Sequence, residues 1–206
     1  GNMDAEERLN WMDREYLSCF DKKQVDSAIR LQEPFDRPVE KSLPYSVAEN
    51  EGTEEKDYLS YNAAAGTSLD VLLSNAFAVL EYALLSSPGA VLKQALLDAG
   101  IGKDILGSYD SGIYQPVFSI IAKNTSKDKK EEFLRIIREE LEKAASQGVD
   151  RDALYAGINI MEFKAREADY GSYPKGLIYG INVFDTWLYD ENRPFDYLKL
   201  DVYGKL

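Results

Sequence analysis

The stretch that decides the fold is PGAVLKQALLDAGIGKDILGSYDSGIYQPVFSIIAK, residues 88–123. Its first part predicts a helix, because Ser87 can cap it, Pro88 suits a first turn that needs no N–H, and Gly100 can end it. The apolar residues in between share one helical face. They are Val91, Leu92, Ala95 and Leu96. The stretch therefore opens with a short amphipathic helix.

The rest of this stretch predicts a β-hairpin. Residues 104–109 and 114–123 have the character of strands, and the Asp-Ser-Gly sequence at 110–112 has turn chemistry. Upstream, residues 58–65 predict another strand, because alternate side chains are apolar. Those on its apolar face are Leu59, Tyr61, Ala63 and Ala65. We expect a mainly antiparallel sheet.

Helices are predicted on both sides of the hairpin. After Gly66, Ser68 can cap a helix whose apolar side chains keep a spacing of three and four residues. They are Leu69, Leu72, Leu73, Ala76, Phe77, Leu80 and Leu84. After the hairpin, residues 128–147 predict a helix that Gly148 ends. Its buried face consists of Phe133, Leu134, Ile137, Leu141 and Ala144.

Two more helices close the chain. Asp150 can cap the first, and Pro174 opens the second. Their apolar residues at helical spacing are Leu154, Ile158, Met161 and Ala165 in the first, and Leu177, Ile181, Phe184 and Leu188 in the second. The order strand, helices, hairpin, helices predicts an α+β fold, a two-layer sandwich with helices on one face of the sheet.

The N-terminal quarter is organised differently. Gly1 and Asn2 resemble the remnant of an expression tag. Residues 4–20 predict a helix with Leu9, Met12, Tyr16 and Phe20 on one face. Residues 21–53 contain Pro34, Pro38 and Pro44 among charged residues. They predict a linker or arm, with room for one edge strand around 39–47.

Composition excludes several kinds of chemistry. The chain has no histidine and a single cysteine, Cys19, among 206 residues. Catalytic triads that need imidazole and the usual nitrogen ligands of zinc are therefore absent, and no internal disulfide can form. We predict no catalytic and no metal-ligating residue in this chain. One unpaired cysteine also fits a reducing compartment, so a cytoplasmic location is expected.

Charge and hydropathy limit the partners. A formal net charge of −12 argues against nucleic acid, whose phosphates require a basic face. The acidic surface would attract cationic peptides, and the alternative is that it only keeps the protein in solution. No apolar run approaches the roughly 20 residues of a membrane span, and the N-terminus lacks the order of a secretory signal. We therefore expect no nucleic-acid partner and no membrane partner.

Two motifs resemble functional sites but are better explained as structural features. Gly100 and Gly102 follow a helix rather than a strand, unlike the glycines of a dinucleotide-binding loop. The carboxylate pairs Glu131-Glu132 and Glu139-Glu140 alternate with basic residues, as on a solvated helix. An independent carboxylate hydrolase is an alternative that rests only on the abundance of acidic residues.

Three segments together resemble a known family. They are PGAVLKQALLDAGIG at 88–102, GSYDSG at 107–112 and GSYPKGL at 171–177. The chain resembles the insulinase-like (pitrilysin-type) zinc metallopeptidases, in the branch of presequence protease and falcilysin, from about Met3 to its end. Such enzymes pair four related α+β domains, of the processing-peptidase type, around a chamber that digests unfolded peptides.

The resemblance implies an indirect function. The family's zinc motif, His-x-x-Glu-His, is absent here, and the order of features resembles the second, non-catalytic domain of the N-terminal half. Residues 1–20 would then be the closing helix of the preceding catalytic domain, 21–53 a linker, and 54–206 the non-catalytic domain. The chain alone would have no cofactor and no activity. The parent polypeptide would be a zinc metalloendopeptidase.

The resemblance also implies partners and a contact surface. The partners would be the catalytic zinc domain, the C-terminal half of the same polypeptide and the unfolded peptide substrate. The family's substrate-contacting Arg and Tyr, seven residues apart, correspond here to Lys93 and Gly100, so that role does not carry over. Tyrosines pack in cores, and they also suit domain faces and peptide contacts. We place Tyr109, Tyr114 and Tyr173 near the chamber or a domain contact, with core packing as the alternative. The alternative is a stand-alone peptide- or protein-binding scaffold without activity.

Overall fold

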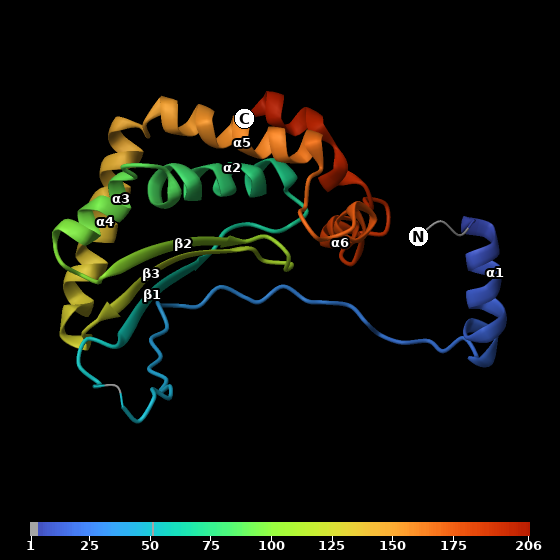
Figure 1. Ribbon diagram of the computed structural model, residues 1–206, viewed down its shortest axis with the longest axis horizontal. Coiled ribbons are helices and arrows are strands. Elements are labelled where there is room, and N and C mark those ends of the chain that lie inside the picture. Colours follow the sequence, from blue (N-terminus) through green and yellow to red (C-terminus); the bar gives the residue numbers. More distant parts are fainter. Residues whose placement is uncertain (1–3, 51) are drawn as a thin grey trace.

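A three-stranded antiparallel sheet lies at the centre of the fold. The computed structural model describes residues 4–50 and 52–206, so the suggested tag remnant lies outside the described residues. The strands are β1 (Asp57–Ala64), β2 (Asp104–Asp110) and β3 (Val117–Thr125), in the order β1-β3-β2 (Figure 1). β2 and β3 form the predicted hairpin, and β1 pairs with the other side of β3. The predicted α+β fold is confirmed.

Helices cover one face of this sheet. α2 (Val71–Glu81) continues through a π-helical segment, Tyr82–Ser86, and is followed by α3 (Val91–Asp98), while α4 (Lys130–Gln147) packs beside α3. Alternating residues of β3 point into the layer between. The buried cluster consists of Leu84, Leu85, Leu92, Leu96, Ile101, Ile105, Phe118, Ile120, Ala122, Phe133, Ile136 and Ile137. The core therefore lies between the sheet and these helices.

Further helices extend beyond the two layers. α5 (Arg151–Glu167) runs along the side of α2 that faces away from the sheet, and α6 (Lys175–Trp187) stands at the opposite end of the sheet from α3 and α4 (Figure 1). α5 approaches closely because Gly157 has no side chain. A Cβ there would lie 3.0 Å from the Tyr82 ring and 3.4 Å from Val79.

Several helix termini follow the sequence signals. Asp150 caps α5 by accepting hydrogen bonds from the N–H groups of Asp152 and Ala153, at 2.8 and 3.1 Å. Gly148 ends α4 with a φ of 87°, a conformation that favours glycine. Gly100 has a φ of 65° after α3, and the N–H of Ile101 bonds back to the Leu96 carbonyl at 3.0 Å. These predictions are confirmed.

Two predicted caps are wrong. α2 begins later than expected and is capped by Asp70, whose carboxylate accepts from the Leu73 N–H at 3.0 Å, while Ser68 is fully buried upstream. Ser87 ends the preceding π-helical segment instead of opening α3, because its hydroxyl donates to the Ala83 carbonyl at 3.2 Å. Ser68 and Ser87 both fit the local sequence signal for a helix cap. The path of the backbone instead places Asp70 and Ala90 at the starts of α2 and α3.

The face of α2 is also shifted from the prediction. Leu72 and Leu73 are exposed, whereas Ser74 and Val79 are buried. α2 is covered on two sides, by the sheet and by α5, so a single apolar stripe does not describe its buried surface.

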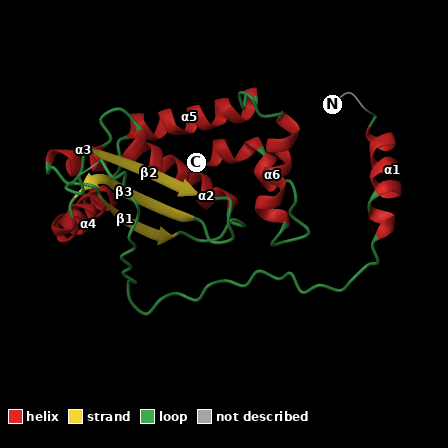
Figure 2. Cartoon of the chain, turned by 60° about the horizontal axis from the view of Figure 1, so that its bottom comes forward, coloured by secondary structure: helices red, strands yellow, loops and turns green. Residues whose placement is uncertain are grey.

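The N-terminal segment lies apart from the sheet and its helices. α1 (Ala5–Glu15) is fully exposed and stands away from the other helices in both views (Figures 1 and 2). Residues 21–50 contain no strand, so the expected edge strand at 39–47 is wrong. The prolines, which cannot donate to a ladder, account for this. Arm contacts include paired hydrogen bonds between Gln32 and Gln115, at 2.6 and 3.1 Å, and an ion pair between Glu40 and Lys130 at 2.6 Å.

One apolar stretch is longer than expected from the sequence. By length and composition, Val71–Asp98 could cross a bilayer, with a mean hydropathy of 1.3 in its most apolar window. A core helix passes the same test, and this stretch contains the core residues Leu84, Leu85, Leu92 and Leu96. The helix is also interrupted at 87–90, where Gly89 has a φ of 73°.

Candidate domain interface

Helix α6 is held by its ends and by one buried side chain. Its first turn begins at Pro174, whose carbonyl accepts from the N–H groups of Leu177 and Ile178 at 3.0 and 3.3 Å. Near its end, the fully buried Thr186 donates its hydroxyl to the Arg193 carbonyl. This bond holds the segment that follows α6 against the helix.

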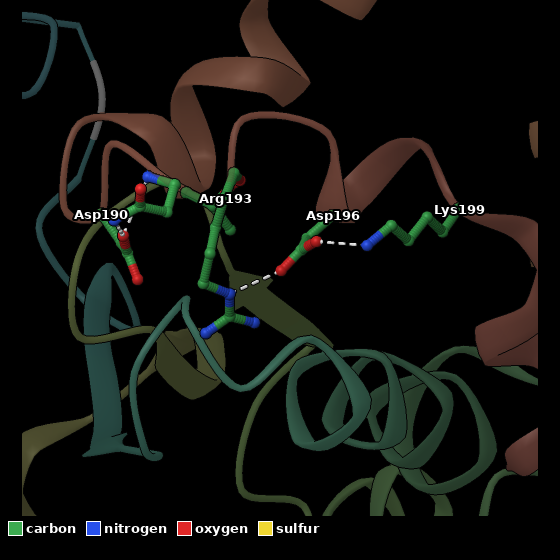
Figure 3. A network of polar contacts seen from close by, with 6 residues as sticks. Asp190, Arg193, Asp196 and Lys199 are labelled. Carbon is green, nitrogen blue, oxygen red and sulfur yellow. Dashed lines mark hydrogen bonds and ion pairs between the residues drawn. The ribbon is translucent and has the colours of Figure 1, made fainter.

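A polar network stabilises the turn after α6 (Figure 3). Asp196 accepts from Arg193 at 2.6 Å and from Lys199 at 2.7 Å. These bonds lower the pKa of the Asp196 carboxyl, the bond from Lys199 most. The C-terminal segment is thereby fixed against α6 and leaves the opposite side of the helix uncovered.

The uncovered side is apolar. We call it the α6 face, and it consists of Leu177, Ile181, Phe184, Trp187 and Leu188, each 48–59% exposed. Phe184 and Trp187 stack with their ring centroids 5.8 Å apart. The spacing of these residues is that of a buried helical stripe, yet the stripe points to solvent. A contiguous exposed apolar patch of this kind marks an interaction surface.

The opposite side of α6 is polar and faces the rest of the molecule. Asn182 and Asp185 line a cavity between α6, α2 and α5. Burial, with a smaller contribution from the nearby Asp110 carboxylate, raises the pKa of Asp185 from 3.8 to about 6. The helix thus has its polar side inward and its apolar side outward, the reverse of an ordinary surface helix.

The raised pKa predicts a stabilising substitution. The folded chain binds the Asp185 proton more tightly than the unfolded chain, so the carboxyl destabilises the fold above about pH 6, and this cost disappears below the unfolded pKa of 3.8. Because the group is half exposed, we expect Asp185→Asn to raise the free energy of unfolding by only about 1 kcal/mol at pH 7.5.

Denaturant unfolding at several pH values measures this effect. The difference between variant and parent should shrink as pH falls and vanish near pH 4, whereas Glu142→Gln on the exposed side of α4 should show no such trend. A variant equally or less stable at pH 7.5 would contradict the assigned burial of this carboxyl.

The three tyrosines singled out from the sequence lie in different surroundings. Tyr109 is half-buried, stacks on Phe77 at 5.8 Å and donates its hydroxyl to Ser74 at 3.4 Å. Tyr114 stacks on Tyr189 at 4.3 Å, and Tyr173 is 63% exposed between α5 and α6. Their proximity to a chamber or domain contact stays a prediction. The α6 face was not predicted as an interaction surface, although the spacing of its residues in the sequence indicates an apolar helix face.

The donor set of this chain does not fit a zinc ion. Histidine is absent, and Cys19 is exposed. Within residues 4–50 and 52–206, no group of three or more Cys, Asp or Glu side chains is arranged to hold a metal. The described residues therefore do not supply a zinc site of the family type.

Comparison with known proteins identifies the fold and the family. Residues 1–161 match the family described as the peptidase M16 inactive domain. The chain belongs to this family. The resemblance to insulinase-like peptidases is thereby confirmed, and membership in the M16 inactive-domain family is consistent with the absence of the zinc motif from these residues.

Relatives of this M16 inactive domain are much longer proteins. It is 41% identical to protein HypA of Clostridium perfringens over 98% of the chain and 21% of that protein. It is 30% identical to presequence protease 1, chloroplastic/mitochondrial, of Arabidopsis thaliana over 97% of the chain and 19% of that protein. The chain thus spans about a fifth of the length of these relatives.

A solved structure supports the fold. An inactive peptidase domain from Bordetella parapertussis superposes with a TM-score of 0.54 at 12% identity, covering 72% of this chain and 82% of that one. At this identity the likeness concerns the fold alone. The likeness supports the α+β fold of this M16 inactive domain.

Proposed function

We propose that this chain is the second, non-catalytic domain in the N-terminal half of a zinc peptidase that degrades unfolded peptides. It packs beside the zinc domain of the same polypeptide and helps to wall the chamber. The observation that carries the proposal is the α6 face, five apolar side chains that point outward from a helix whose polar side faces the rest of the molecule. A neighbouring domain that covers them would remove this apolar area from water.

The N-terminal helix supports the same arrangement. Leu9, Met12 and Tyr16 of α1 are 66%, 40% and 55% exposed, and α1 lies apart from the sheet and its helices. An amphipathic helix without a partner requires another surface to bury its apolar stripe. We assign α1 to the preceding catalytic domain, and residues 21–53 to the linker that joins the two.

The uncovered face of the sheet suits a chamber wall. On this face Asn62 accepts a hydrogen bond from Ser119 at 2.7 Å and donates one to Ser60 at 2.8 Å. Such polar side chains can exchange hydrogen bonds with the backbone of an unfolded peptide. A wall of this kind contributes to catalysis by confining and positioning the substrate, although none of its side chains reacts.

Substitutions on the α6 face test the proposal in the polypeptide that the natural gene encodes. We expect that polypeptide to contain His-x-x-Glu-His upstream of this domain, to bind zinc and to lose peptide cleavage on chelation. Phe184→Glu should lower peptide turnover at least about tenfold, because a charge would be buried at the domain contact. The matched control is Val91→Glu, at an exposed position of α3 at the other end of the molecule (Figure 1).

Three outcomes would contradict the proposal. The first is unchanged turnover in Phe184→Glu with a normal melting temperature. The second is a natural gene that encodes no zinc motif, which would favour the stand-alone scaffold. The third is an equal loss in Phe184→Glu and Val91→Glu, which would show that a surface charge, rather than a contact at α6, causes the effect.

A further inference from the structure

A cavity of about 450 Å³ lies between α2, α5, α6 and the C-terminal 3₁₀ segment Leu200–Lys205. This volume is within the range of roughly 300–1,000 Å³ typical of small-ligand sites. Its lining is rich in phenol rings, supplied by Tyr170, Tyr179, Tyr197 and Tyr203. Tyr170 and Tyr179 meet edge to face, with centroids 6.2 Å apart.

The charged side chains of the lining leave one carboxylate uncompensated. They are Arg166, Asp185 and Lys199. Arg166 donates to Glu162 at 2.8 Å, and Lys199 is engaged by Asp196 at 2.7 Å (Figure 3). Asp185 makes no hydrogen bond and no ion pair within the described part of the chain. The two basic groups of the lining are therefore occupied, and the available charge of the cavity is negative.

Neighbouring groups strengthen this negative character. Asp110, at the end of β2, is close enough to Asp185 for the two carboxylates to repel each other. The Tyr197 hydroxyl is buried and makes no hydrogen bond of ordinary geometry among the described residues. A cation that donates hydrogen bonds would relieve the repulsion and could satisfy this oxygen.

The lining favours an organic cation over a metal ion. No third carboxylate joins the pair in a metal-binding group within residues 4–50 and 52–206. Phenol rings attract guanidinium and ammonium groups through their π faces. A guanidinium also stacks on rings, pairs with a carboxylate in two places and is more weakly hydrated than an ammonium. Arginine therefore fits this cavity better than lysine.

We propose that the cavity bounded by α2, α5 and α6 binds the guanidinium group of an arginine side chain, with Asp185 as its counter-ion and Tyr179 as a stacking surface. The inference extends the proposed function, because it names the kind of peptide residue that this domain would retain. The net charge of −12 would attract arginine-containing peptides to the same domain.

Binding of two small probes to the 206-residue chain tests the inference directly. The probes are N-acetyl-arginine amide and N-acetyl-citrulline amide, which have the same shape but differ in charge. Amide NMR shifts are followed at one ionic strength. We expect saturable shifts in α6 around Asp185 and an affinity for the arginine probe at least about tenfold higher than for citrulline.

Three variants separate this site from general electrostatics. Asp185→Asn should reduce the preference for arginine to less than about twofold, and Tyr179→Leu should weaken arginine binding a few-fold. Glu142→Gln makes the same charge change on α4 and should leave the preference intact. Melting curves confirm that each variant is folded.

Several results would overturn the inference. They are equal affinities for the two probes, shifts located away from α6, or an equal loss in Asp185→Asn and Glu142→Gln. The proposed function fails separately, because it is measured by peptide turnover in Phe184→Glu. The 206-residue chain could show no preference for arginine while Phe184→Glu still lowers peptide turnover in the full polypeptide. That combination would refute only the assignment of the cavity.

Discussion

Phe133→Ala is expected to lower the free energy of unfolding by about 4 kcal/mol, the cost of removing a large buried ring and leaving a cavity. Phe133 is 1% exposed and belongs to the cluster that joins α4 to α3 and the sheet. The other buried side chains of this cluster limit how far the site can collapse. For a domain of this size the melting temperature should fall by roughly 8–16 °C.

The matched control for this change is Phe163→Ala on α5. The same atoms are removed, but the Phe163 side chain is 65% exposed. Its loss should change stability by less than about 1 kcal/mol. Thermal and denaturant unfolding measure both variants. Similar losses in the two would contradict the burial of α4 against the sheet, and so would a loss below about 1 kcal/mol in Phe133→Ala.

Gly107→Ala is expected to destabilise the fold by about 3 kcal/mol, through overpacking rather than a cavity. Gly107 lies in β2 directly beneath the π-helical segment after α2. A Cβ at this position would lie 2.7 Å from the Leu85 Cβ and would also clash with the Glu81 carboxylate. Leu85 is 1% exposed and cannot move aside, so strand and helix would have to separate.

Gly112→Ala is the control for the glycine substitution. Gly112 follows β2 in the hairpin loop, and the nearest atom to a Cβ there is the Asp110 Oδ1, at 3.6 Å. This is ordinary contact, so the variant should stay within about 0.5 kcal/mol of the parent. Urea unfolding compares the two. A tolerated alanine at Gly107 would mean that α2 sits farther from β2 than the structure places it.

Local signals in the sequence predicted a large part of this fold. Asp150 and Gly148 mark helix boundaries through short-range chemistry, because a cap or a positive φ involves residues within four positions. The hairpin of β2 and β3 follows from two strands close in sequence. Gly107 illustrates the limit of such signals. A glycine within a strand indicates close approach, but the partner, Leu85, lies far away along the chain.

The candidate sites were harder to predict from the sequence than the fold. The spacing of Leu177, Ile181, Phe184 and Leu188 indicates an apolar helix face, yet spacing alone does not say whether that face meets the core or solvent. The cavity around Asp185 is assembled from α2, α5, α6 and the C-terminal segment. No periodicity within one segment can predict a site made from four.

The sequence by itself determined that the chain contains no imidazole, that it forms an α+β domain and that it resembles an M16 peptidase domain without the zinc motif. These properties depend on residue chemistry and on patterns within single elements. Only the tertiary structure decided that α6 turns its apolar side outward and that Asp185 lies among tyrosines without an ion-pair partner in the described residues. Both depend on how separate helices pack, because the position of a helix relative to its neighbours determines which of its faces is buried.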